Sequence, residues 1–248
     1  MKNYSNRYTF IFASIMVVVV AAVLSVVSTQ LQPLQKKNQR IAKMTDILKS
    51  VNKTENLDEA DNKDQYIEDQ YEQYIVDTYV LNSAGKRVEG TDAFQVDMAK
   101  QILLPHDQRK LPVYVCELDN GERKYILPLR GKGLWGPIWG YISLNDDFNT
   151  VYGAVFDHQA ETPGLGAEIT TEGFQQDFNG KKIFDEEGNF IGINVYKGGD
   201  GAAREAGDMM HGVDGVSGGT ITSNGVENMV EDCLRPYISY FKENSEEI

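Results

Sequence analysis

A run of twenty residues without a charged side chain, residues 9–28 (TFIFASIMVVVVAAVLSVVS), constrains this chain more than any other feature. An α-helix needs about 20 apolar residues to cross the hydrocarbon core of a bilayer. A cleaved signal peptide is the alternative, but its apolar run is usually about 7–15 residues long and ends at a small-residue cleavage site. Residues 30–32 provide no such site. The sequence therefore predicts one transmembrane helix at residues 9–28, and Pro33 is expected to end it.

The charges of the chain are distributed unevenly. All 37 acidic residues follow the apolar run, and the net charge is −13. This acidity argues against nucleic acid as a partner, because binding to phosphates depends on lysine and arginine. Two basic residues precede the apolar run and four follow it closely (Lys2 and Arg7; Lys36, Lys37, Arg40 and Lys43). By the positive-inside rule, this narrow difference favours a cytoplasmic location for the C-terminal domain.

The rest of the chain divides by pattern. After an N-terminal tail, residues 1–8, and the apolar run, apolar residues at spacings of three and four predict a helical stalk, followed by a polar linker or surface helix. We assign residues 29–73 to this stalk and linker. A globular domain is expected over residues 74–248.

Strand signals dominate the first part of the globular domain. Segments rich in β-branched and aromatic residues, separated by turn residues, predict strands, and Asn120-Gly121 predicts a hairpin between two of them. The predicted strands are residues 74–81, 111–118, 123–129, 139–144, 153–156 and 190–195. A helical pattern returns at residues 223–241. The expected fold class is α+β, a single N-terminal transmembrane helix followed by a domain with a central, largely antiparallel sheet.

Residues 214–226 (DGVSGGTITSNGV) carry the sharpest chemical signal. Glycines let backbone N–H groups approach an anion closely, and a following helix adds oriented N–H donors and a positive dipole. Threonine hydroxyls can donate to phosphate oxygens or become esterified. The segment is therefore a candidate phosphate site, with Ser217, Gly218, Gly219, Thr220 and Thr222 as candidate residues. The alternative is a glycine-rich turn before a helix that Thr222 or Ser223 caps.

This segment resembles the covalent flavinylation motif of the FMN-binding domain family, Ser/Thr-Gly-Ala-Ser/Thr-x-Thr. In that family a flavin transferase joins FMN to the last threonine through a phosphoester, and Thr222 matches that threonine. Gly219 stands where alanine is commoner, a departure of one methyl group. Asp214 matches the acidic residue ahead of the motif, where the resemblance implies a role in modification or in fixing the loop.

Two further blocks resemble the same family. Residues 161–168 (ETPGLGAE) contain a proline and glycines that give a rigid loop, suited to one face of a flat flavin ring. Residues 128–141 (PLRGKGLWGPIWGY) contain Leu134 and Trp135, candidates for stacking or packing against the flavin ring. The candidate flavin contacts in these blocks are Thr162, Gly164, Leu165, Leu134 and Trp135. Each block taken alone is equally consistent with a plain surface turn.

Together with the apolar run, these blocks are similar to the flavin-carrying subunits of sodium-pumping NADH:quinone oxidoreductases. The resemblance implies an electron-transfer subunit of the bacterial inner membrane, in contact with other subunits and lipid, on a path from NADH to ubiquinone. It places the flavin domain on the periplasmic side, against the charge count. Two alternatives remain: the G subunit of an Rnf-type ferredoxin:NAD oxidoreductase, and a membrane-tethered assembly or binding protein without flavin.

No complete active site is visible in this chain alone. Cys116 and Cys233 are far apart in sequence, and the three histidines share no metal-ligand spacing. The glycine-rich segment is not a dinucleotide fingerprint or a Walker A loop. The sequence therefore predicts no metal site, no catalytic residue of its own, and enzymatic activity only as part of a complex.

Overall fold

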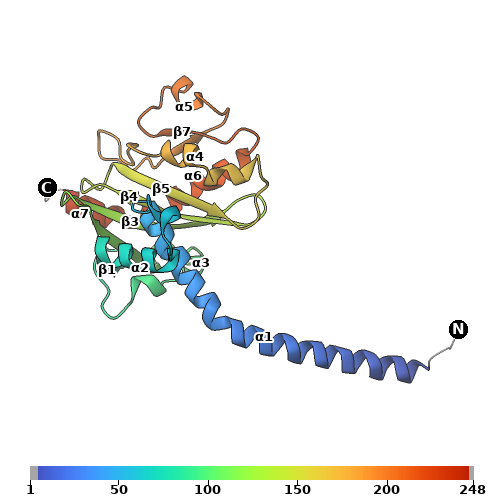
Figure 1. Ribbon diagram of the computed structural model, residues 1–248. Helices are drawn as coiled ribbons and strands as arrows, with labels where there is room; N and C mark the ends of the chain where they lie inside the picture. Colours follow the sequence, from blue (N-terminus) through green and yellow to red (C-terminus); the bar gives the residue numbers. More distant parts are fainter. Residues whose placement is uncertain (1–4, 246–248) are drawn as a thin grey trace. The chain divides into compact units, whose positions relative to one another are not determined.

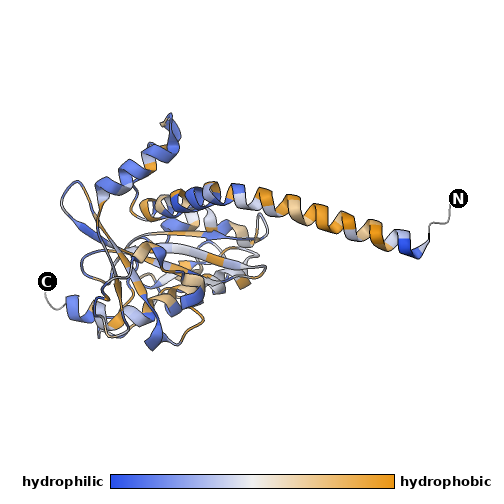
Figure 2. Cartoon of the chain, turned by 90° about the horizontal axis from the view of Figure 1, so that it is seen from below, coloured by the Kyte–Doolittle hydropathy of each residue, from blue (hydrophilic) through white to orange (hydrophobic). Residues whose placement is uncertain are grey.

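The computed structural model describes residues 5–245, and the chain divides into two compact units, Met1–Lys43 and Met44–Ile248. The first unit is formed mainly by helix α1 (Asn6–Lys49), along which apolar residues form a continuous stretch (Figure 2). Within the described residues, α1 is the one helix that is long and apolar enough to cross a membrane. The apolar side chains of its residues 9–28 are exposed in the protein alone, as lipid-facing side chains would be.

The prediction that Pro33 ends the first helix is wrong, because α1 continues through this residue to Lys49. A proline removes one backbone hydrogen bond and crowds the preceding turn. The leucine, glutamine and lysine residues on both sides of Pro33 are good helix formers, and they favour continuation of the helix.

An antiparallel sheet forms the centre of the second unit (Figure 1). Its strands follow one another in space as in sequence, in the order β1 (Ile75–Leu81), β2 (Leu111–Glu117), β3 (Arg123–Lys132), β4 (Pro137–Leu144) and β5 (Val151–His158). The turn between β2 and β3 contains Gly121 at φ 82°, which a glycine adopts without strain. The predicted α+β fold and antiparallel sheet are confirmed.

The C-terminal helices cover one face of the sheet. Helix α6 (Thr220–Leu234) packs against β3, where a side chain at Gly131 would collide with Met229. The predicted continuous helix over residues 223–241 is instead interrupted, because Pro236 lies in a 3₁₀ turn, η5 (Arg235–Tyr237), before α7 (Ile238–Ser245). The start of α6 lies three residues earlier than predicted.

The opposite face of the sheet packs against the end of α1 and α2 (Lys63–Tyr74). Ile47 and Leu48 are fully buried, and the Ser143 hydroxyl donates to the Ser50 carbonyl oxygen over 2.6 Å. Residues 44–73, which the sequence pattern assigns to a stalk and linker, therefore pack with the globular unit. Their apolar side chains Met44, Ile47, Leu48, Val51 and Ile67 are buried in this unit, and α2 packs against β1.

Shorter elements complete the second unit. They are η1 (Leu57–Glu59), η2 (Ala93–Gln95), α3 (Met98–Gln101), η3 (His106–Gln108), η4 (Gly166–Thr170), α4 (Glu172–Gln176), β6 (Asn194–Tyr196), α5 (Ala202–Glu205) and β7 (Gly212–Asp214). Strands β6 and β7 pair in parallel. The predicted strand at residues 190–195 is mostly loop, because Gly192 at φ 77° turns the chain just before β6.

Candidate functional site

The glycine-rich segment joins β7 to the first turn of α6. Gly218 has φ 75°, and a Cβ there would lie 2.7 Å from the Leu165 side chain. Gly219 is the N-cap of α6 and lies against the Leu165 backbone and the Val216 side chain. Position 218 therefore needs glycine, whereas a Cβ at position 219 would require its neighbours to move by a few tenths of an ångström, because the loop of residues 161–165 packs directly onto both.

Thr222 is the third residue of α6 and is only 1% exposed. Its hydroxyl donates to Oε2 of Glu161 over 2.6 Å. Neither Thr222 nor Ser223 caps the helix, since Ser223 Oγ instead accepts a hydrogen bond from the Val216 N–H in the preceding loop. The capping explanation of this motif is therefore not what the structure shows.

The N-terminus of α6 has no side-chain cap. The N–H groups of Thr220, Ile221 and Thr222 lie in the first turn of the helix, where no preceding carbonyl of the helix can accept from them. Such a terminus carries a partial positive charge and binds anions. The unmet donors and the Thr222 hydroxyl therefore lie in the same turn.

A cavity of about 410 Å³ adjoins this turn. Its volume is within the usual range for small-molecule sites of about 300–1,000 Å³. Three separate chain segments line it: the β3–β4 turn, the loop after β5, and the loop and first turn of α6. The lining residues are Leu134, Trp135, Glu161, Thr162, Leu165, Gly166, Gly218, Gly219, Thr220, Ile221 and Thr222.

Four large apolar side chains of this cavity are exposed. Their exposed fractions are 47% for Leu134, 66% for Trp135, 42% for Leu165 and 59% for Ile221. Single exposed apolar residues are ordinary, but a cluster around one cavity marks a site that binds an apolar or aromatic group. The cavity thus combines apolar walls with an anion-binding helix terminus.

Glu161 connects the three segments. It follows β5, is 5% exposed, and accepts hydrogen bonds from the Thr222 hydroxyl and, over 2.9 Å, from the backbone N–H of Trp135. Its own N–H donates to Nδ1 of His158. Gly133 and Gly166 lie so close that a Cβ at either position would be 2.5 Å from a carboxylate oxygen. The carboxylate is therefore held in one position.

The structure places most of the predicted site residues around this cavity. Thr222, Thr220, Gly218, Gly219, Thr162, Leu165, Leu134 and Trp135 line it. Three others lie elsewhere. Gly164 shapes its loop at φ 75°, with its N–H donating to Glu168. Ser217 lines a neighbouring cavity of about 500 Å³, and Asp214 accepts hydrogen bonds from the N–H groups of Gly201 and Ala203 at the start of α5.

Sequence reasoning did not select Glu161, Gly166 or Ile221 as site residues. Glu161 and Gly166 belong to the quoted ETPGLGAE block, but nothing in that block predicts contact with a residue 61 positions away. The place of Ile221 in the first turn of α6 can be predicted only when α6 is known to begin at Thr220.

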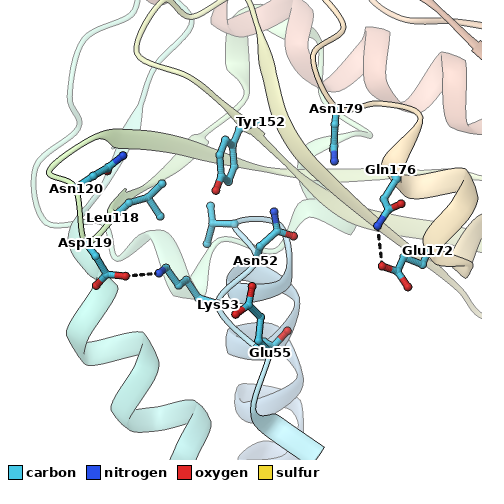
Figure 3. Close-up of a pocket in the computed structure, with 12 residues that line it drawn as sticks. Asn52, Lys53, Glu55, Leu118, Asp119, Asn120, Tyr152, Glu172, Gln176 and Asn179 are labelled. Carbon is cyan, nitrogen blue, oxygen red and sulfur yellow. Dashed lines mark hydrogen bonds and ion pairs between the residues drawn. The ribbon is translucent and has the colours of Figure 1, made fainter.

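A second cavity, of about 650 Å³, has a different character (Figure 3). Its labelled walls are mainly polar, and these groups bind one another: Lys53 pairs with Asp119 over 2.6 Å, and Gln176 donates to Glu172 over 2.7 Å. Because several of its polar groups pair with one another, whereas the Thr222 cavity combines exposed apolar side chains with an uncapped helix terminus, the Thr222 cavity is the candidate site.

Comparison with known proteins gives the class first. The sequence profile of the FMN-binding domain matches residues 133–235, a range that includes all three segments of the Thr222 cavity. The chain is 32% identical to the C subunit of the Na(+)-translocating NADH-quinone reductase of Vibrio vulnificus over 231 residues, 87% of this chain and 86% of the relative. The chain belongs to the family of these C subunits, the NqrC family.

Solved structures agree with this assignment. The structure of the corresponding reductase subunit from Parabacteroides distasonis has a TM-score of 0.71 and 39% identity, with 85% of this chain and 96% of that chain covered. The structure of Shewanella oneidensis NqrC has a TM-score of 0.67 and 26% identity, covering 84% and 99%. The resemblance to flavin-carrying subunits of sodium-pumping oxidoreductases is thereby confirmed.

Proposed function

We propose that this chain is an electron-transfer subunit of a Na⁺-translocating NADH:quinone oxidoreductase and that it carries FMN joined through its phosphate to Oγ1 of Thr222. Membership of the NqrC family and the match to the FMN-binding domain support the first part. One observation carries the second: the buried Thr222 hydroxyl lies in the uncapped first turn of α6, beside an apolar-walled cavity.

The residues present fit a flavin phosphate. A phosphate on Thr222 Oγ1 lies within the helical turn whose N–H groups have no acceptor in the helix, so the positive end of α6 offsets its charge. The exposed side chains of Leu134, Trp135, Leu165 and Ile221 would contact the flavin ring. Bound FMN supplies one- and two-electron redox chemistry; the protein determines its position and surroundings.

The partners follow from the family and from the chemistry. Other subunits of the oxidoreductase would cover the exposed apolar rim of the cavity and exchange electrons across it. A flavin transferase would be needed to form the phosphoester, since the chain contains no nucleotide-binding fingerprint. A covalent link keeps FMN bound independently of its affinity, which matters where dissociated cofactor would be diluted.

The membrane arrangement is part of the proposal. Residues 9–28 of α1 would span the bacterial inner membrane once and contact lipid, with the flavin domain on the periplasmic side. Of the expected N-terminal tail, residues 1–8, residues 1–4 lie outside the described residues and Asn6 already begins α1. Residues 29–43 would connect the span to the globular unit. The excess of basic residues after the span is small enough for assembly with other subunits to override it.

Intact mass measurement with peptide mapping tests the covalent site. The chain co-expressed with its flavin transferase should gain the mass of FMN less water on the peptide that contains Thr222. Thr222→Ala should abolish this gain and the in-gel fluorescence after denaturation. Thr220→Ala is the matched control, because Thr220 lines the same cavity without contacting Glu161, and it should still be modified. Flavin retained by denatured Thr222→Ala would show that the site is elsewhere.

A further inference from the structure

The group that faces the Thr222 hydroxyl is a buried carboxylate. Oε2 of Glu161 lies 2.6 Å from Oγ1 of Thr222 and accepts the hydroxyl proton in a hydrogen bond. A helical threonine commonly donates instead to a backbone carbonyl in the preceding turn. In this protein the hydroxyl points away from its own helix towards the carboxylate.

The surroundings of Glu161 leave its carboxylate free to accept a proton. Among the ion pairs of residues 5–245, none involves Glu161. Its other oxygen is fixed by the Trp135 N–H, and Gly133 and Gly166 close in on both sides. A carboxylate without a cationic partner, held against one hydroxyl, is the arrangement of a general base beside its nucleophile.

We infer that Glu161 is the general base for attachment of the flavin to Thr222, an inference that rests on the proposed function. Thr222 Oγ1 attacks the flavin-side phosphorus of a flavin dinucleotide, in which the phosphate is activated as a pyrophosphate. The Oγ1–P bond forms, and the P–O bond to the nucleoside monophosphate breaks; that group leaves with the electron pair. The Oγ1 proton passes to Oε2 of Glu161. The step involves no oxidation or reduction.

The fixed geometry also explains why this base belongs to the acceptor protein. Thr222 is 1% exposed, so a base on the flavin transferase would have to enter the cavity together with the donor phosphate. Glu161 is already at hydrogen-bond distance, on the side of Thr222 that the loop of residues 161–165 covers. The nucleophile is therefore oriented and paired with its proton acceptor before the transferase binds.

Glu161→Gln is the sharpest test, because it keeps the size of the side chain. The amide oxygen that it introduces can still accept from the Trp135 N–H, but the amide NH₂ group must then donate to Thr222 Oγ1 and cannot take a proton. We expect the first-order rate of flavin attachment at saturating donor and transferase to fall by about 10²–10⁴-fold, the usual contribution of a general base. The concentration of protein at half-maximal rate should change little, and intact mass follows the reaction.

Two further variants separate base catalysis from packing. Glu161→Ala should be as slow as Glu161→Gln, and added formate should restore part of its rate by occupying the space of the missing carboxylate. Glu168→Gln is the matched control: Glu168 lies in η4, directly after the loop of residues 161–165, and accepts from the Gly164 N–H, but no hydrogen bond joins it to Thr222. Its attachment rate should stay within about threefold of the wild-type rate.

The outcomes distinguish this inference from the proposed function. If Glu161→Gln is modified within about threefold of the wild-type rate while Thr222→Ala stays unmodified, Glu161 is not the base and Thr222 remains the site. If Glu161→Gln is slow but also has a lowered melting temperature, and formate does not rescue Glu161→Ala, Glu161 is a packing residue only. If Thr222→Ala acquires flavin, the proposed function fails whatever Glu161 does.

Discussion

Two glycine-rich junctions in this molecule lead into helices, and they differ in what accepts hydrogen bonds from the first N–H groups of the helix. At the start of α5 the chain turns at Gly201, φ 89°, and the Asp214 carboxylate accepts from the N–H groups of Gly201 and Ala203. At the start of α6 the chain turns through Gly218 and Gly219, and no side chain accepts from the first N–H groups. The N–H groups at the start of α5 thus bind a carboxylate of the protein, whereas those at the start of α6 are available to an acceptor from outside the chain.

The comparison shows that glycine content alone does not identify an anion site. Both segments have the flexible backbone that such a site needs. The difference is whether another part of the fold supplies a carboxylate to the N–H groups. Asp214 does so for α5, whereas Glu161, the carboxylate beside the first turn of α6, accepts from the threonine hydroxyl. We therefore propose the junction at the start of α6 as the flavin-phosphate site.

Of changes at the two junctions, the largest expected effect comes from placing a side-chain acceptor at the start of α6. Gly219→Asp places a carboxylate at the N-cap of α6, where it can accept from the N–H groups of the first turn. It should compete with the flavin phosphate and repel it, lowering flavin attachment by more than about tenfold in a transferase assay read by in-gel fluorescence.

Gly219→Ala is the control for this change. Its Cβ would meet Val216 Cβ at 3.0 Å and needs only a small adjustment of the neighbours. The alanine variant should be modified at close to the wild-type rate. Equal attachment in the alanine and aspartate variants would mean that the N–H groups of α6 do not bind the phosphate.

Removing the side-chain acceptor at the start of α5 should have a smaller effect, measured as the free energy of unfolding. Asp214→Ala removes both acceptors from the start of α5, and loss of such a cap costs about 0.5–2 kcal/mol of the free energy of unfolding. Urea unfolding of the purified protein measures this. Asp200→Ala is the matched control, because Asp200 is exposed, and it should change the free energy by less than about 0.5 kcal/mol. Equal losses in the two variants would remove the capping role from Asp214.

A further prediction, outside the two junctions, concerns a carboxylate whose charged form is disfavoured by burial. Burial, together with the nearby Asp157 charge, raises the pKa of Asp46 to about 6, with Lys49 opposing the shift. The folded pKa is thus above the unfolded value near 3.8, so the charged form destabilises the fold at about pH 7.5, and this penalty disappears as the pH falls below about 4. Asp46→Asn should therefore stabilise the protein by about 3 kcal/mol at about pH 7.5, since each pKa unit corresponds to about 1.4 kcal/mol.

Thermal unfolding at two pH values checks the Asp46 prediction. The advantage of Asp46→Asn over the wild type should shrink towards zero at about pH 4, where the wild-type carboxyl is largely protonated in the folded state and begins to protonate in the unfolded state. An advantage that is the same at both pH values would assign the effect to packing instead of charge.

The sheet could be predicted from sequence because its signals are local. Alternating β-branched and aromatic residues and the Asn120-Gly121 turn fix strands and hairpin register between neighbours in the chain. Helix boundaries were less accessible. Gly219, the N-cap of α6, lacks a capping side chain by which the start of the helix could be predicted. At Pro33, the helix propensity of the neighbouring residues outweighs the effect of the proline.

The site was predictable in part. The glycine-rich motif indicates Thr222 and its neighbours, because glycine and threonine types carry local chemistry. The contact of Glu161 with Thr222 depends on how the loop after β5 folds over α6, and no local pattern encodes it. The same holds for Asp214, which the motif associates with the flavin site and the fold directs to α5.

The uncapped start of α6 has a consequence for the fate of the unmodified chain. Before flavin is attached, the helix end has N–H groups without a side-chain acceptor, next to an exposed apolar rim. Attachment at Thr222, as proposed, would supply an anion to these N–H groups and cover part of the apolar rim. The modified protein should therefore unfold locally less often than the precursor. Proteases that degrade transiently opened proteins would then remove unmodified copies faster. Cofactor loading would thereby select which copies persist long enough to be assembled.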